Sequence, residues 1–115
     1  MPAVTLLDAA DSTGAGAVLS LPHLVKNHAV QLSNTEGSPT TVTIALEGSL
    51  DGVTFFVLDS STYTSVANMN FAVDKPVNYV RLNLTVLSGG TSPTVTAIYE
   101  GHRQTSSKIG RRGQF

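Results

Sequence analysis

Alternation of apolar and polar residues is the feature that most constrains how this chain folds. It is clearest at residues 41–47, where Val42, Ile44 and Leu46 fall on one side and Thr43 and Glu47 on the other. Successive side chains of a β-strand point to opposite faces of its sheet, so this spacing predicts a strand with one buried and one solvent-facing side. A helix cannot place these residues in this way, because its period is about 3.6 residues.

The same alternation recurs along the chain. Residues 80–86 repeat it, with Val80, Leu82, Leu84 and Val86 on one face. A third alternating run and several shorter segments rich in β-branched or aromatic residues add further strand candidates: residues 94–100, 4–7, 17–21, 28–33, 53–58 and 70–73. About eight strands are therefore expected, and no capped segment with helical periodicity competes with them.

Clusters of glycine, proline, serine and aspartate separate these segments and mark turns. Two of them, residues 49–52 and 88–93, lie between alternating runs and contain glycine, which adopts positive φ freely. Both are predicted to be hairpin loops between antiparallel strands. A single open sheet would leave an apolar face in water, so the expected fold is all-β: an antiparallel two-sheet β-sandwich of jelly-roll or immunoglobulin-like type.

The length of 115 residues suits one domain with a single core. The chain has no cysteine, which excludes disulfides, thiol catalysis and cysteine-ligated zinc. Its first residues lack the basic region and the apolar stretch of a secretory signal, and no apolar run approaches the roughly 18 residues of a membrane span. We therefore expect a soluble protein that is made in the cytoplasm without a signal peptide.

Charge divides the chain into two parts. Residues 1–100 contain all eight acidic side chains against three basic ones, which is a net charge of −5. The final segment carries four basic side chains and no acidic one, which is a net charge of +4. We therefore predict a β-sandwich domain at residues 1–101 and an extended basic C-terminal tail at residues 102–115, and the charge of the tail predicts an acidic partner surface.

The tail contains the predicted interaction residues. Alternation stops at His102, and two apolar side chains are too few for the segment to form a core of its own. We expect it to dock on a protein surface, such as a neighbouring subunit, through its basic and apolar side chains: Arg103, Lys108, Ile109, Arg111, Arg112 and Phe115. Nucleic acid is not the expected partner, because four charges are few and the acidic domain would repel phosphate.

The remaining residues show no catalytic or metal-binding pattern. His23, His28 and His102 lack metal-ligand spacing, and the chain has no Gly-x-Ser-x-Gly nucleophile motif. Asp11 and Asp51 stand in turn sequences, and the acidic residues do not follow a calcium-loop pattern. The sequence therefore predicts a protein that is not an enzyme and that uses no cofactor or metal.

The aromatic residues leave an alternative open. Three tyrosines and three phenylalanines supply rings of the kind that stack on sugars in carbohydrate-binding modules, although tryptophan is absent: Tyr63, Tyr79, Tyr99, Phe55, Phe56 and Phe71. Packing in the core or across strands is the favoured interpretation of these rings.

Two segments resemble known families. Residues 46–55, Leu-Glu-Gly-Ser-Leu-Asp-Gly-Val-Thr-Phe, resemble the Ser-x-Asp-Gly-x-x-aromatic hairpin of discoidin-type β-sandwiches. Residues 79–82, Tyr-Val-Arg-Leu, resemble their aromatic-Val-Arg-Leu strand. The same pair, in the same order, is similar to that of small tailed-phage virion proteins, in which a Ser-Gly-Gly-Thr-x-Pro-Thr-Val-Thr segment often follows, as at residues 88–96. The short chain without cysteine or tryptophan, and its basic tail, favour the phage family.

The phage resemblance implies a virion structural protein, most specifically a capsid decoration or cement protein that stabilises the head shell. The implied partners are the major capsid protein or other virion proteins, and the implied state is a homo-oligomer, such as a trimer. Two alternatives stay open: a carbohydrate- or host-surface-binding module of discoidin type, and a tail or neck structural protein of the virion.

Overall fold

A computed structural model describes residues 3–63 and 69–102, and within these residues it contains strands but no helix. The strands are β1 (Val4–Ala10), β2 (Gly14–Ala15), β3 (Leu19–Val25), β4 (Asn27–Glu36), β5 (Thr41–Ser49), β6 (Phe56–Tyr63), β7 (Met69–Ala72), β8 (Val77–Ser88) and β9 (Thr94–His102). Accordingly, no helix in this part of the chain is long and apolar enough to cross a membrane.

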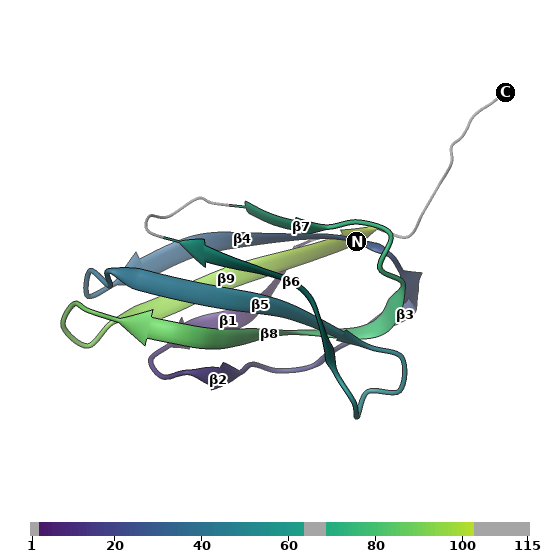
Figure 1. Cartoon of the computed structure of the whole chain (residues 1–115), viewed down its shortest axis with the longest axis horizontal. Helices are drawn as coiled ribbons and strands as arrows, with labels where there is room; N and C mark the ends of the chain where they lie inside the picture. The colour runs from purple at the N-terminus through teal and green to yellow at the C-terminus, as the bar shows by residue number, and fades with distance from the viewer. Residues whose placement is uncertain (1–2, 64–68, 103–115) are drawn as a thin grey trace, which may run out of the picture.

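The strands form two antiparallel sheets that pack face to face (Figure 1). One sheet has the order β1-β9-β4-β7, and the other has the order β2-β8-β5-β6, with β3 also paired to β8. β2 and β3 occupy the same edge, because Gly14 lies opposite Leu84 and Leu19 lies opposite Val80. The nine strands therefore fill eight positions, and the predicted two-sheet sandwich of about eight strands is confirmed.

The strand order decides between the two predicted types of sandwich. β1 pairs with β9, so the first and the last strand lie side by side, while β1 and β2 belong to different sheets. In an immunoglobulin-like fold the first two strands are neighbours in one sheet. Two four-stranded sheets whose successive strands mostly cross from one sheet to the other form a jelly roll.

The two predicted hairpins have different outcomes. β5 and β6 form an antiparallel pair that closes at Gly48 and Phe56, so the hairpin at residues 49–52 is confirmed. The hairpin at residues 88–93 is wrong, because β8 and β9 belong to different sheets. This loop is held against the β4–β5 turn, where Thr91 N donates a hydrogen bond to Gly37 O at 2.8 Å. Alternation cannot separate the two cases, since a hairpin and a crossover both join half-buried strands.

Most strand boundaries differ from the prediction by a few residues, and two of these differences have a clear physical reason. β6 begins at Phe56 and not at residue 53, because Asp51 Oδ1 accepts hydrogen bonds from Val53 N (2.8 Å) and Thr54 N (3.0 Å) and removes these donors from any ladder. β3 begins at residue 19, not 17, and continues through Pro22, which an edge strand tolerates because one row of its backbone groups needs no ladder partner.

The core lies between the facing sheets. β5 and β8 contribute Ile44, Leu46, Leu82 and Leu84, all 0% exposed, and they pack with buried side chains of the other sheet: Val30, Leu32, Val95, Ala97 and Tyr99. The prediction that Val86 shares this face is wrong. Thr43 lies opposite residue 86 and Ile44 opposite residue 84, so an extra residue in β8 forms a bulge that turns Val86 outward, where it is 39% exposed.

One histidine is part of this core. His28 is buried on the face that it shares with Val30, its Nδ1 lies 2.6 Å from the Tyr99 hydroxyl, and its Nε2 lies 2.9 Å from the Lys75 carbonyl oxygen. The carbonyl can only accept, so Nε2 carries the proton and Nδ1 accepts from the hydroxyl. Burial lowers the pKa of His28, and the hydrogen bond to the Lys75 carbonyl opposes this shift. The neutral imidazole is therefore the form that the fold stabilises.

This burial predicts a pH-dependent stability. The unfolded chain, with an ordinary histidine pKa near 6.5, binds a proton that the native state resists, so the free energy of unfolding should fall as the pH drops from 7.5 to 5.5. The slope approaches at most about 1.4 kcal/mol per pH unit. Urea unfolding at several pH values measures it. A His28→Gln variant should be less stable and should lose most of this slope, whereas a His23→Gln variant should keep it because His23 is exposed.

Candidate functional site

The β5–β6 loop, residues 50–55, is built around one carboxylate. Asp51 Oδ1 accepts from the Ser49 hydroxyl at 2.8 Å in addition to the Val53 and Thr54 amides, and Gly52 N donates to Ser49 Oγ at 2.9 Å. The Thr54 and Val53 N–H groups, with the Ser49 hydroxyl, lower the pKa of Asp51 to about 2. The turn is therefore held by a charged side chain at every physiological pH.

The loop lies against strand β8. Gly52 has φ of 78°, and a Cβ at this position would lie 3.2 Å from the Tyr79 ring, so the turn requires glycine for its conformation and for its contact. The Arg81 guanidinium carbon lies 4.1 Å from the centre of the Phe55 ring, which is a cation–π contact. The two sequence segments that carry the family resemblance thus form one structural unit, in which the Ser-x-Asp-Gly loop docks on the Tyr-Val-Arg-Leu strand.

A polar network supports this unit from the outer face of the sheet. Glu47 Oε1 accepts from Arg81 Nε at 2.7 Å, and its Oε2 accepts from Asn83 Nδ2 at 3.0 Å. Glu47 is only 8% exposed although it faces away from the core, as the alternation predicted. Glu47 lies opposite Arg81 on the neighbouring strand, so the two form a cross-strand ion pair. The pairing register of β5 and β8 brings them together although they are far apart in the sequence.

Apolar side chains surround this rigid loop. Leu50, Val53 and Phe56 are 64%, 82% and 65% exposed, and we name these three residues the loop patch. Beside them a pocket of about 280 Å³ opens between the loop and the β7–β8 link, and it is lined mainly by apolar groups: Gly48, Ser49, Leu50, Phe56, Leu58, Asp74, Lys75, Pro76 and Val77. Exposed apolar groups gathered on one rigid feature are typical of a protein-binding surface.

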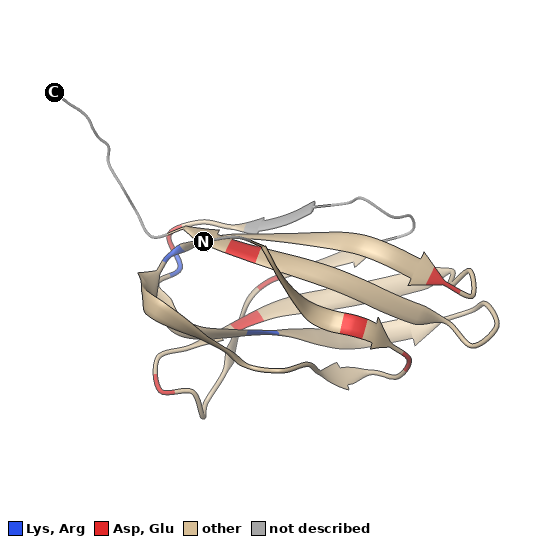
Figure 2. Cartoon of the chain, turned by 180° about the vertical axis from the view of Figure 1, so that it is seen from behind, with Lys and Arg blue, Asp and Glu red and all other residues tan. Residues whose placement is uncertain are grey.

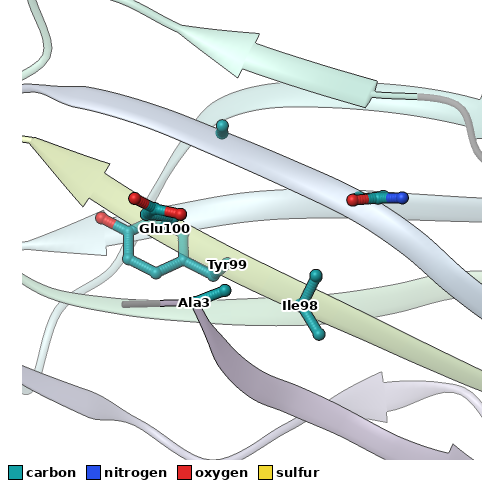
Figure 3. A pocket seen from close by; sticks show the side chains of 6 residues that line it. Ala3, Ile98, Tyr99 and Glu100 are labelled. Carbon is teal, nitrogen blue, oxygen red and sulfur yellow. The ribbon is translucent and has the colours of Figure 1, made fainter. Parts of the chain in front are cut away.

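Two other depressions lie elsewhere on the surface. One of about 70 Å³ lies on the outer face of the β1-β9-β4 part of the sheet, with Ala3, Ile98, Tyr99 and Glu100 around it (Figure 3). The other, of about 410 Å³, lies under the β1–β2 connection and is lined mostly by small residues between 5 and 17. The described ranges contain no group of three or more side chains suited to hold a metal ion.

The three histidines have different surroundings. His23 is exposed, His28 lies in the core, and His102 lies 3.5 Å from Glu100 on β9. The predicted tail residues, Arg103, Lys108, Ile109, Arg111, Arg112 and Phe115, lie outside the described residues, whereas His102 is still paired with Asn27. The sequence alone does not reveal the loop patch, because its pattern places Leu50 in a turn and Val53 in a strand. The Ser-Leu-Asp-Gly turn sequence was the signal that could have found it.

The aromatic rings do not form one platform among the side chains that the structure describes. Tyr99 is 0% exposed and belongs to the core, while Phe55 stacks on Arg81 and Tyr79 contacts the loop at Gly52. Phe56 is exposed at the pocket. The side chains of Tyr63 and Phe71 lie outside the description. The described rings therefore serve packing in the core or between strands and loop, apart from Phe56.

Comparisons with known proteins agree with the fold. No protein-family model matches this chain, and no curated protein matches it. Among solved structures the chain is similar to YomS, a protein derived from the SPBc2 prophage, with a TM-score of 0.63. The sequences are 16% identical, and the match covers 85% of this chain and 88% of YomS. At this identity the likeness shows a shared β-sandwich fold.

Replacement of the turn glycine should loosen the loop. Gly52→Ala places a Cβ against the Tyr79 ring and forces an L-residue to φ of 78°, so the free energy of unfolding should fall by about 1–2 kcal/mol. Denaturant unfolding measures the loss. The matched control is the same substitution in a Tyr79→Ala background, where the ring is absent and only the cost of the positive φ remains. An equal loss in both backgrounds would contradict the proposed contact with Tyr79.

Removal of the arginine should leave the buried carboxylate without its main partner. Arg81→Met should destabilise the fold by about 1.5–3 kcal/mol, because Glu47 is largely desolvated and loses a charge-assisted hydrogen bond. The double variant Glu47→Leu/Arg81→Met should recover part of this loss, because it removes both charges together. A strictly additive double-mutant cycle in denaturant unfolding would show that the pair is not coupled.

Proposed function

We propose that this protein is a non-enzymatic structural protein of a phage virion, and specifically a capsid decoration or cement protein that binds and stabilises the head shell. The observation that carries the proposal is the loop patch. Hydrogen bonds to Ser49 and Asp51 order the loop internally. Gly52 and Phe55 contact β8, and the apolar side chains of the loop patch stay exposed. A pre-organised apolar surface suits protein binding, because little conformational entropy is lost on association.

The phage assignment has two supports. The chain shares its fold with a prophage-derived protein, and its loop and strand segments resemble those of small tailed-phage virion proteins. Jelly rolls recur in viral capsid proteins, where the sheets form a stable frame and the loops at their ends make contacts. The proposed partners are the major capsid protein or other virion proteins, and the proposed state is a homo-oligomer, such as a trimer, on the virion.

If the protein decorates the capsid, it should be found on phage heads and should need the loop patch to bind them. We expect the protein to co-sediment with the heads of the phage that encodes it when heads and tails are separated on a density gradient. Val53→Asp should reduce the number of copies per head at least tenfold at limiting protein, since one charged side chain at the centre of an apolar contact costs more than the roughly 1.4 kcal/mol that a factor of ten represents.

The matched control is Thr91→Asp, which adds the same charge in an exposed loop at the opposite end of the sandwich. Its occupancy should equal that of the wild type. Recovery of the protein with tails or necks would instead support the tail or neck alternative. Absence of the protein from purified particles would overturn the virion role, and binding to a glycan array would then favour the carbohydrate-binding alternative.

A further inference from the structure

The pocket beside the loop patch has the chemistry of a peptide-binding site. Leu58, Pro76 and Val77 supply apolar lining, and Leu50 and Phe56 stand exposed at its opening. Its volume of about 280 Å³ is enough for one or two apolar side chains of a partner. The pocket therefore fits a segment that is anchored by apolar residues.

The net negative charge of the domain favours a bound segment that also carries basic residues. Asp74 and Lys75 both line the pocket, and Asp74 Oδ1 lies 3.4 Å from Lys26 Nζ while 83% of the Asp74 side chain stays exposed. Asp51 stands in the adjoining loop with its pKa held at about 2, so the complementary charge comes mainly from the domain as a whole. Across the described residues eight acidic side chains oppose three basic ones, and acidic positions recur along both sheets and their loops (Figure 2). An occupant with basic residues beside its apolar anchors would complement this surface.

The chain itself contains a segment of this kind. Residues 103–115 carry four basic side chains, no acidic one, and the apolar Ile109 and Phe115. We propose that the pocket binds residues 103–115 of a second copy of this chain. The proposal rests on the assembly role proposed above and names the contact by which copies join.

β9 ends near the pocket. It stays paired with β4 as far as His102, which lies opposite Asn27, so the described chain ends at the end of the sandwich where the pocket opens. The β7–β8 link is fastened beside this point by hydrogen bonds from Asp74 N to Asn27 Oδ1 (3.2 Å) and from Lys75 N to Lys26 O (2.9 Å). The segment is thus placed to reach the same end of a neighbouring copy, and the assembly role proposed above assigns it to that copy.

The length of the segment allows such an exchange. Thirteen residues span up to about 43 Å when extended, which exceeds the 29 Å and 19 Å of the two shorter dimensions of the domain. Two copies can exchange tails reciprocally as a two-fold dimer, and copies that pass their tails around a ring form a closed oligomer such as a trimer.

Cysteine cross-linking tests the contact directly, because the natural chain has no cysteine. A full-length Leu50→Cys chain is mixed with a full-length Gly110→Cys chain under mild oxidation, and mixed disulfide dimers are counted by mass spectrometry. We expect at least fivefold more mixed dimer than from Thr91→Cys with Gly110→Cys, since residue 91 lies in the loop at the far end of β8. Adding Phe56→Ser to the Leu50→Cys chain should lower the yield to this background.

Three results would overturn the proposal. One is equal yield from the pocket and the control cysteines. Another is a monomeric mass for the wild type by light scattering at all concentrations. The third is an internal disulfide in the Leu50→Cys/Gly110→Cys double variant with no mixed dimer, which would place the segment in its own pocket. If cross-linking fails but the protein still occupies phage heads, this contact is ruled out while the virion role remains supported.

Discussion

Leu32 and Val95 of one sheet and Ile44 and Leu82 of the other lie between the sheets, at 0–1% exposure, and their removal from water holds the sandwich together. Each sheet alone would expose an apolar face, so neither forms without the other. The contact also sets the topology, because strands that alternate between the sheets tie the two layers at both ends. The positions of the loops and of the outer faces follow from this packing of the two sheets.

The central strands β5 and β8 link the core to the candidate site. Their inner residues fill the core, while their outer residues, Glu47 and Arg81, form the ion pair beneath the β5–β6 loop. The loop therefore rests on the part of the sheet that has paired strands on both sides. Its order comes from hydrogen bonds to Asp51 and from contact with Tyr79, while the apolar side chains of the loop patch stay exposed.

Much of the fold was readable from single strands. The alternation at Val42, Ile44 and Leu46 predicted a buried face, and the turn residues predicted the β5–β6 hairpin. The candidate site was readable only in part. The Ser-x-Asp-Gly sequence marked a turn, but the capture of the Val53 amide by Asp51, which ends the predicted strand early, depends on a three-dimensional turn geometry that no periodicity reports.

By itself, the sequence determined an all-β sandwich, because period-two alternation allows one buried face per strand and two such faces must meet. It also determined the distribution of charge, which is −5 over residues 1–100 and +4 over the residues that follow. Only the tertiary structure decided that the sandwich is a jelly roll, that residues 88–93 cross between sheets, and that the loop patch and the pocket adjoin. Those features depend on which strands pair, and partners distant in the sequence, such as β1 and β9, are chosen by the packing of the whole core.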